Sequence, residues 1–346
     1  MNMNLDNILT KNLFPDFVLR FGIRRLLTER LKNEKKENIE EQQASLMNLI
    51  SQLRKSPIAV NTPEANEQHY EVPTEFFKTV LGKNLKYSSG YWKNNSTSLD
   101  QAETDMLELT CQRANLKNNE EILELGCGWG SLTLYMAKKF PQSKITAVSN
   151  SKTQKIYIDN EALKRNLNNI NIITVDINQF KSETKFDRIV SVEMFEHMRN
   201  YSELFRKVKD LLKPEGELFI HIFTHKEYSY LFEVQSETDW MAKYFFTGGI
   251  MPSNHLMFYF TDGFKTLNHW IVAGTHYEKT ANAWLKNMDN NKEMILSLFE
   301  KTYGRENTTK WWVYWRVFFM SCAELWGYKN GEEWFVSHYL FKRSEL

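Results

Sequence analysis

Apolar and polar positions follow two patterns in the middle of this chain. Short apolar runs alternate with stretches in which apolar residues recur every three or four positions. The runs predict buried strands and the stretches predict amphipathic helices. We expect strands at 121–125, 144–148, 171–175, 186–192 and 217–223, and helices at 132–140, 152–166 and 201–212. Strands that alternate with helices in this way indicate a parallel, doubly wound α/β sheet.

The C-terminal part continues this pattern. Strand-like runs at 265–272 and 334–341 bring the expected sheet to seven strands, a Rossmann-like fold. Insertions at about 226–262 and 280–330 are expected to form a helical substrate cap on a domain spanning 63–346. The first insertion carries aromatic residues and a Gly248-Gly249 hinge, and we expect it to roof a pocket. Aromatic residues between 311 and 319 have helical spacing, which predicts core packing with a few residues facing the substrate.

The first 62 residues are expected to form separate N-terminal helices. Between 13 and 31, apolar residues recur at helical spacing at Leu13, Phe17, Phe21, Leu27 and Leu31. This amphipathic helix could pack on its own domain with solvated arginines, serve as a substrate lid, or lie on a membrane surface. The interleaved acids Asp16 and Glu29 favour the first two alternatives. Residues 32–43 are nearly all polar and predict a solvated helix or linker, after which 46–53 resume the helical period.

Charge and composition narrow the possible functions. Lysine and arginine (44) nearly cancel aspartate and glutamate (43), so there is no basic field to hold nucleic acid, and we expect no such partner. The hydrophobic fraction of 42% and the charged fraction of 25% are typical of a globular protein. The aromatic fraction of 14% is high, and predicts core or a pocket for flat or cationic ligands.

The cysteines and the hydropathy of the sequence indicate the cellular compartment in which the protein acts. Cys111, Cys127 and Cys322 form no close pair in the sequence, which argues against a disulfide framework or a zinc site, and we expect no metal. No apolar run approaches the roughly 20 residues needed to span a bilayer. The N-terminus lacks the charged-then-apolar order of a signal peptide. We therefore expect a cytoplasmic protein that at most touches a membrane.

A glycine-rich turn follows the first predicted strand. The segment ELGCGWG at 124–130 breaks the strand and opens a helix, which brings backbone N–H groups close to a ligand. Its G-x-G-x-G spacing departs from the dinucleotide fingerprint, because Ser131 stands where that motif has its third glycine. Glu124 could hold the ammonium group of a bound amino acid moiety. The turn predicts a cofactor site that does not bind NAD.

The ELGCGWG segment resembles motif I of class I S-adenosylmethionine-dependent methyltransferases. Two further segments, YSSGYW (87–92) and VEMFEHM (192–198), resemble the cyclopropane fatty acid synthase superfamily. Within it the chain is most similar to the coclaurine N-methyltransferase group, on the segments EMFEHMRN (193–200), FIHIFTH (219–225) and GYKNGEEW (327–334). The resemblance covers about 68–342 and implies S-adenosyl-L-methionine as cofactor.

The resemblance also implies which residues bind the cofactor. The second strand lacks a ribose-binding acid, and this absence is usual in the superfamily. Ser149, Asn150 and Gln154 would line the ribose side, Asp176 and Ile177 would contact adenine, and Tyr87 with Ser88 would close over the methionine end. From the turn itself, the expected contacts are Glu124, Gly126, Cys127, Gly128 and Gly130.

The fourth strand delivers Glu193 to the ligand-binding edge of the sheet. If a helical turn starts there, Glu196 and His197 lie on the same face as Glu193. Two carboxylates and an imidazole beside a sulfonium would attract a protonated amine and remove its proton before methyl transfer. These three residues are the expected catalytic group.

Three more residues, Ser89, His221 and Tyr277, are expected in a substrate or anion pocket. In cyclopropane synthases, the positions that resemble Glu196, His221 and Tyr277, with a cysteine at the place of Ser89, hold a bicarbonate ion that acts as base. Serine here weakens the bicarbonate alternative but leaves it open.

The sequence therefore predicts a methyltransferase that acts on the nitrogen of a small or medium amine. Two alternatives stay open at this point. A cyclopropane synthase or fatty acid methyltransferase would use the same cofactor on an unsaturated lipid acyl chain, and the N-terminal amphipathic helix suits it. A non-enzymatic partner module would usually have lost the glycine turn or the acids, and this chain keeps both.

Overall fold

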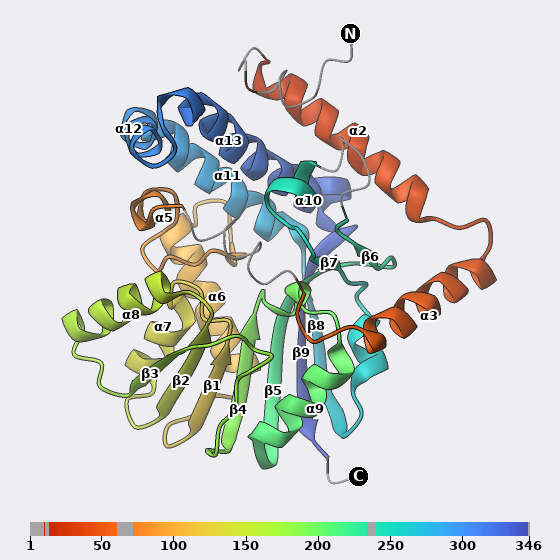
Figure 1. Ribbon diagram of the computed structural model, residues 1–346, viewed down its shortest axis with the longest axis vertical. Helices are drawn as coiled ribbons and strands as arrows, with labels where there is room; N and C mark the ends of the chain where they lie inside the picture. The colour runs from red at the N-terminus through yellow and green to blue at the C-terminus, as the bar shows by residue number, and fades with distance from the viewer. Residues whose placement is uncertain (1–9, 11–13, 61–71, 234–239, 345–346) are drawn as a thin grey trace.

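The computed structural model describes residues 10, 14–60, 72–233 and 240–344. Its centre is a seven-stranded sheet in the order β3-β2-β1-β4-β5-β9-β8 (Figure 1). The first five strands along the chain run parallel, β9 is antiparallel to β5, and β8 is antiparallel to β9. The predicted doubly wound seven-stranded sheet is thereby confirmed. The strands are β1 (Glu121–Leu125), β2 (Lys144–Ser149), β3 (Ile170–Thr174), β4 (Phe186–Val192), β5 (Leu212–His225), β8 (Phe264–Val272) and β9 (Trp334–Arg343).

Helices cover both faces of the sheet because its central strands are apolar on both sides. One face packs against α6 (Leu99–Arg113), α7 (Ser131–Lys139) and α8 (Lys152–Lys164). The other face packs against α9 (Tyr201–Leu211). The strand order reverses between β1 and β4, and at such a switch point the carboxyl ends of the strands leave a crevice for a ligand.

The boundary between α9 and β5 differs from the prediction. Leu212, expected as the last helical residue, begins β5 and pairs with Phe186, ahead of the predicted start at 217. The register then shifts between Phe186 and Arg188, and Glu215 has a φ of 66°. The turn-forming residues at 213–216 are therefore accommodated as an irregularity within a strand.

A helical cap stands over the carboxyl ends of the strands (Figure 1). Its aromatic side chains pack on one another, as in the pairs of Trp315 with Phe76 and Phe245, whose ring centroids lie 4.6 and 5.2 Å apart. Most of the high aromatic content is therefore core. The cap contains α5 (Thr74–Val80), α10 (Trp240–Tyr244), α11 (Gly274–Asn290), α12 (Lys292–Tyr303), α13 (Arg305–Gly327), the strands β6 (Tyr230–Leu231) and β7 (Ile250–Met251), and the short helix η3 (Tyr328–Gly331). Two other short helices are η1 (Phe195–His197) and η2 (Leu256–Phe260).

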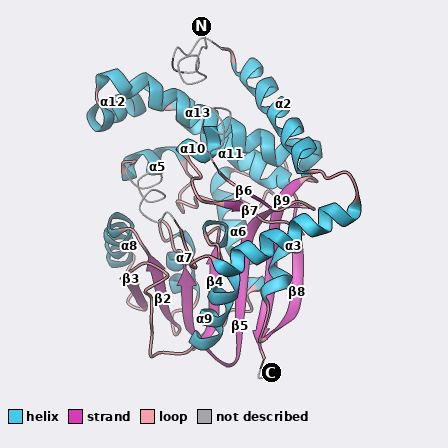
Figure 2. Ribbon diagram, turned by 45° about the vertical axis from the view of Figure 1, so that its right-hand side comes forward, coloured by secondary structure: helices cyan, strands magenta, loops and turns pink. Residues whose placement is uncertain are grey.

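The first two helices of the described chain are α2 (Asp16–Glu34) and α3 (Ile39–Lys55). The polar stretch at 32–43 contains the end of α2, a break, and the start of α3, which Asn38 caps by accepting from the Glu41 N–H. The buried Leu49, Ile50 and Leu53 of α3 join the core that holds α9 (Figure 2).

Helix α2 packs on the cap through a stripe that shares Leu27 and Leu31 with the predicted one but not its phenylalanines. Leu19, Ile23, Leu27 and Leu31 pack against the cap core, whereas Phe17 and Phe21 are 73% and 72% exposed. Leu13 lies outside the described residues. Among the helices of the described chain, none is long and apolar enough to cross a bilayer. The division into 1–62 and 63–346 stays a prediction.

Candidate functional site

A cavity of about 280 Å³ lies between the carboxyl edge of the sheet and the cap. Its floor comes from the ends of β1, β2 and β4, and its upper wall from α11, α13 and the segment around β7. Most of the predicted site residues line it: Tyr87, Ser88, Glu124, Gly126, Cys127, Gly128, Ser149, Asn150, Gln154, Asp176, Ile177, Glu193, Glu196, His197 and Tyr277.

The glycine turn after β1 needs its glycines for two different reasons. Gly126, Gly128 and Gly130 all have positive φ, at 80°, 50° and 77°, where other residues are strained. A Cβ on Gly126 would lie 2.7 Å from Met194, and one on Gly130 would lie 2.6 Å from Ile158. A Cβ on Gly128 meets no atom within 4 Å. The first and third glycines therefore allow close packing, while Gly128 presents its backbone to the cavity.

Gly130 differs from its predicted role. It is the N-cap of α7 and is absent from the cavity lining within the described residues. Its contribution is to let α7 approach Ile158 of α8, because a side chain there would collide.

Glu124 lies at the inner end of the turn, buried at 2% exposure. Its carboxylate accepts a hydrogen bond of 2.5 Å from Thr133 Oγ1 of α7. Burial raises its pKa to about 8, although the Thr133 hydroxyl and the nearby Lys86 ammonium oppose that shift. The carboxyl group is thus oriented toward the cavity and can meet a cationic ligand group.

The opposite end of the cavity is polar. Ser149 Oγ donates to Gln154 Oε1 at 2.7 Å, which holds the buried Gln154 side chain at the start of α8. Asp176 Oδ1 accepts from the Asn178 N–H at 2.7 Å, so it also shapes its own turn. Ile177 adds an apolar surface beside it. Such a surface with nearby hydroxyl and amide groups suits a nucleoside.

Glu193 begins the sharp turn that follows β4. Its φ is 47°, and the helical residues that follow begin only at Phe195, in η1. The expected helical turn from Glu193 is therefore wrong. The left-handed backbone instead turns the carboxylate inward, where it accepts three hydrogen bonds. These come from Tyr277 Oη at 2.7 Å, from His221 Nε2 at 3.2 Å and from the Ser89 N–H at 3.2 Å.

Glu196 and His197 reach the cavity from η1. Glu196 is 1% exposed, and within the described residues its Oε2 atom has no hydrogen-bond partner. Burial and the charge of Glu193 raise its pKa well above the ordinary value. The His197 ring stacks on Phe246, with centroids 5.1 Å apart. Glu193 and Glu196 are thus brought together, but by a left-handed turn and a short helix in place of one continuous helical face.

Ser89 and His221 do not line the cavity, contrary to the expectation of a pocket role. Both are fully buried behind Glu193. The Ser89 hydroxyl donates to the Gly90 carbonyl at 3.0 Å, so only its backbone N–H reaches the Glu193 carboxylate. Of the three predicted pocket residues, Tyr277 alone faces the cavity.

Lys86 is a cavity residue that the sequence analysis missed. It is fully buried and donates a hydrogen bond to Ser88 Oγ. Burial lowers the pKa of Lys86 to about 8, and the negative charges of Glu193, Glu103 and Glu124 oppose that shift. Its position directly before the Tyr87-Ser88 pair was the available signal. Trp284, whose Nε1 has no partner within the described residues, was missed as well.

The cap supplies an apolar wall opposite the acids. From the 226–262 insertion, Phe232, Met241, Phe246 and Met251 line the cavity. Trp240 and Phe245 turn away from it and pack on Tyr314 and Phe318. From α13, the wall receives Phe318, Cys322, Leu325 and Trp326. The insertion therefore roofs the pocket, and the aromatic stripe of α13 is mainly core, as predicted.

The glycine turn, the paired acids and the capped sheet together match a known family. A family model described as mycolic acid cyclopropane synthetase matches residues 59–330. The chain belongs to the mycolic acid cyclopropane synthetase family. Membership of this family and the solved relative below agree with the predicted S-adenosylmethionine-dependent methyltransferase.

Relatives within and around this family differ in their named reactions. (S)-Coclaurine N-methyltransferase of Thalictrum flavum subsp. glaucum is 44% identical over 96% of this chain and 93% of its own length. The crystal structure of coclaurine N-methyltransferase bound to N-methylheliamine and SAH has a TM-score of 0.95 and 41% identity, covering 98% of this chain and 99% of that one. Cyclopropane-fatty-acyl-phospholipid synthase of Escherichia coli (strain K12) is 31% identical over 70% of this chain and 58% of its own length.

The residues of this family member fit its cofactor. Gly128 leaves an open approach for a ligand to the backbone of the turn. The buried Glu124 carboxyl and Lys86 ammonium stand near the end that would hold the amino acid moiety, and the Ser149–Gln154 pair stands near the end that would hold the nucleoside. The chain is an S-adenosylmethionine-dependent methyltransferase.

Proposed function

We propose that this enzyme methylates the nitrogen of a small or medium amine that carries an aromatic ring system. The observation that carries this proposal is the pairing of the Glu193 carboxyl, whose side chain is 9% exposed, with the buried Glu196 carboxyl beside the cofactor turn, opposite an aromatic wall. Buried acids attract a cation, and aromatic rings bind flat groups and the faces of cations. S-adenosylmethionine, when bound, supplies the methyl group on its sulfonium centre.

The side chains of Glu193, Glu196 and His197 would each have a different role in the reaction. Burial raises the pKa of Glu193, but the Lys86 charge and the hydrogen bonds that its carboxylate accepts oppose that shift and favour the charged form, so Glu193 would hold the incoming ammonium group electrostatically. Glu196 has a free buried oxygen and a raised pKa, so it would accept the proton of the ammonium group. His197, fixed against Phe246, would carry that proton onward to solvent. The neutral nitrogen could then attack in line.

Among amines, the aromatic wall favours a ring-bearing substrate. Phe232, Phe246 and Phe318 face the cavity together with flexible methionine side chains at 241 and 251. Methionine fills irregular gaps beside aromatic ligands at low cost. The names of the relatives, coclaurine N-methyltransferase among them, agree with this substrate class.

Modification of an unsaturated lipid is the competing function. An alkene carries no proton that must be lost before it attacks, so it has no use for a second buried carboxylate at the point of attack. Glu193 also occupies the donors at Ser89, His221 and Tyr277, the positions that the resemblance assigns to bicarbonate in cyclopropane synthases. Both points support an amine, and not an unsaturated lipid, as the methyl acceptor.

An activity screen tests the proposal. The purified protein is incubated with methyl-labelled S-adenosylmethionine and either a panel of amines or vesicles of unsaturated phospholipid. The panel holds tetrahydroisoquinolines with and without aromatic substituents, and aliphatic amines of matched size. We expect label in the ring-bearing amines above all. Label found in phospholipid alone would overturn the amine proposal, and label in aliphatic amines alone would overturn the role of the aromatic wall.

We also infer that the enzyme acts in the cytoplasm. Cys111, Cys127 and Cys322 are all free thiols, and burial raises the pKa of Cys111 to about 12. Free thiols are typical of reducing compartments. Fractionation of the source cells with an antibody to this chain tests the inference, and recovery in a secretory compartment would contradict it.

A further inference from the structure

Three adjacent strands carry a row of side chains that ends at the catalytic acids. Trp270 of β8 pairs in register with His338 of β9, and His338 pairs with His221 of β5. His221 in turn lies opposite Val192 of β4, the residue before Glu193. Paired residues on neighbouring strands project to the same face. The row therefore crosses the sheet to the turn that holds Glu193.

Hydrogen bonds join this row into a chain of four groups. Arg113, the last residue of α6, places Nη1 2.9 Å from His338 Nδ1. His338 Nε2 lies 2.9 Å from His221 Nδ1. His221 Nε2 lies 3.2 Å from Glu193 Oε1. Both histidines are fully buried, and within the described residues neither they nor Arg113 line the cavity.

The chemistry of arginine fixes the direction in which the hydrogen bonds run from Arg113 to Glu193. A guanidinium group only donates hydrogen bonds and keeps its proton at any physiological pH. His338 Nδ1 must therefore accept, which leaves the proton on its Nε2. That N–H donates to His221 Nδ1, which leaves the His221 proton on Nε2. The last group, Glu193, can then only accept.

We propose that Arg113 is a positioning residue for methyl transfer, which acts through His338 and His221 to keep Glu193 an oriented carboxylate. The proposal rests on the proposed function of Glu193. It assigns the two acids different states: Glu193 receives N–H or O–H donors from three sides and holds charge, whereas the proton of the amine goes to Glu196. Without Arg113, His338 could reverse its tautomer, and His221 Nε2 could then accept a hydrogen bond from Glu193, which would favour the protonated form of that carboxyl.

The surroundings keep the histidines neutral. Burial, assisted by the charges of Lys86 and Arg113, lowers the pKa of His221 and of His338 well below the ordinary value. A neutral imidazole is what a one-directional relay requires. The titratable groups near Glu193 are Lys86, Glu196, His221, Tyr277 and Cys322, and those near the histidine pair are Lys86, Arg113 and His269.

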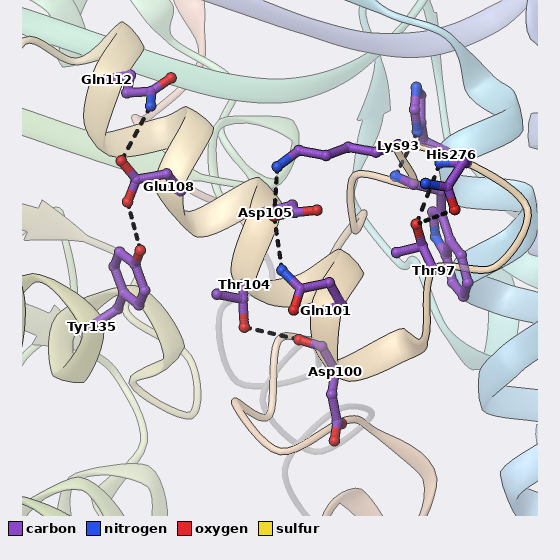
Figure 3. A network of polar contacts seen from close by, with 12 residues as sticks. Lys93, Thr97, Asp100, Gln101, Thr104, Asp105, Glu108, Gln112, Tyr135 and His276 are labelled. Atoms are coloured by element: carbon purple, nitrogen blue, oxygen red, sulfur yellow. Dashed lines mark hydrogen bonds and ion pairs between the residues drawn. The ribbon is translucent and has the colours of Figure 1, made fainter.

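The position of Arg113 is itself held firmly. Its guanidinium lies over the Trp270 ring, 5.0 Å from the centroid. The helix it ends is tied down along its length, as Figure 3 shows: Asp105 accepts from Lys93 and Gln101, and Glu108 accepts from Tyr135 of α7 at 2.6 Å. Arg113 is therefore anchored at the edge of the sheet and can impose one orientation on the chain.

The first test reads the tautomers without any activity. Long-range proton–nitrogen NMR of the histidine-labelled protein distinguishes Nδ1–H from Nε2–H rings. We expect His221 and His338, assigned by single substitutions, as Nε2–H tautomers in the wild type, and a mixture in Arg113→Met. An Nδ1–H or doubly protonated ring at either position in the wild type would overturn the proposal. This result is independent of which substrate the enzyme uses.

The second test uses matched variants and the pH profile of KM for the best substrate of the wild type, because Glu193 is the residue that holds the ammonium group whereas Glu196 sets the rise of turnover with pH. His338→Leu breaks the chain of hydrogen bonds, whereas His338→Gln retains an acceptor and a donor at similar spacing. Loss of one charge-assisted hydrogen bond should raise the pKa of Glu193, so the pH below which KM rises should move up by about one unit in Arg113→Met and His338→Leu. His338→Gln should stay near the wild type.

Leu267→Ala is the structural control, since Leu267 also lies on β8 and packs against the same core as Trp270 but is no part of the chain of hydrogen bonds. We expect it to lower stability without moving the pH profile. An equal shift in Leu267→Ala and Arg113→Met, or no shift in either chain-breaking variant, would contradict a positioning role. A wild type inactive on every amine would overturn the proposed function, while the tautomer result would still decide the relay.

Discussion

At the scale of single residues, Gly128 has the most direct relation to the cofactor. A side chain there would project into open space at the cavity, where the backbone of the turn would contact a bound ligand. We expect Gly128→Val to fold and to lose binding of S-adenosylmethionine and S-adenosylhomocysteine in calorimetry, because a branched side chain blocks the approach. Gly304→Ala, another positive-φ glycine facing only a flexible Glu306 side chain, is the matched control. Unchanged affinity in a folded Gly128→Val protein would refute the cofactor site.

Glu196 and Glu193 should matter in different ways. Removing a positioned base typically lowers the rate about 10²–10⁴-fold. We therefore expect Glu196→Gln to lose turnover by that factor with little change in KM, and Glu193→Gln to raise KM as well, because the ammonium loses its counter-charge. Glu203→Gln, at a glutamate of α9 whose side chain is 45% exposed, is the control. Full turnover in Glu196→Gln on the best amine would place the base elsewhere.

Ser89 illustrates a residue whose backbone matters more than its side chain. Its hydroxyl donates to the neighbouring Gly90 carbonyl, and its N–H donates to Glu193. Ser89→Ala keeps that N–H, so we expect steady-state turnover close to the wild type. A large loss in Ser89→Ala would indicate that the hydroxyl holds a ligand, as the cysteine at this position does in the cyclopropane synthases it resembles.

At the scale of elements, α2 is held to the cap by a partly buried apolar stripe and by ion pairs. It has no fully buried residue, but Arg20 and Arg24 both contact Glu324 of α13, which is 6% exposed. Arg316 adds a contact to Asp16 at 2.8 Å. An amphipathic helix with so little buried surface depends on such contacts, which makes α2 the element most easily detached.

Glu324→Gln should therefore loosen α2 while the sheet stays intact. Since Arg24 is 65% exposed, solvent screens part of the interaction, and we expect the local stability of α2 to fall by about 1 kcal/mol. Hydrogen exchange followed by mass spectrometry measures this as faster exchange confined to α2. Glu300→Gln, on the exposed side of α12, should leave exchange unchanged. Uniformly faster exchange across the sheet would show that Glu324 supports the whole fold instead.

At the scale of the whole molecule, the chemistry depends on closing a cap over the sheet. Burial raises the pKa of Glu196 well above its ordinary value, since the cap excludes water and Glu193 adds its charge. A base works only when deprotonated. Turnover on amines should accordingly be low at acid pH and should rise as pH passes through that raised pKa, with a further gain as the amine itself loses its proton.

The effect of bicarbonate on the rate is a second test of whether the base is a carboxylate of the protein. The groups that would bind it at Ser89, His221 and Tyr277 already donate to Glu193. We expect the rate–pH profile on an amine to be the same in degassed, bicarbonate-free buffer as in buffer with added bicarbonate. Activity that needs bicarbonate, or that falls as pH rises, would be inconsistent with a carboxylate base supplied by the chain.

Local patterns in the sequence were sufficient for the fold and for the cofactor end of the site. Strands such as 121–125 and 186–192 were predicted with their observed bounds, because apolar periodicity and turn residues act within a few positions of each other. The glycine turn was recognisable for the same reason. The two acids after β4 line the cavity at the edge of the sheet where they were expected, since the end of a parallel strand defines the edge at which ligands bind.

Everything that depends on which distant side chains meet was decided by the tertiary structure. Whether Leu19 or Phe17 faces inward is set by the surface of α13, and periodicity alone leaves both possible. The left-handed turn at Glu193 brings its carboxylate to Tyr277, His221 and Ser89, which lie far from it in the sequence. Arg113 and His338 carry no local signal, and Lys86 has only its position directly before the Tyr87-Ser88 pair. Their roles come from burial and from register between strands more than a hundred residues apart, for instance His221 and His338, and long-range contacts of that kind leave no periodic trace in the chain.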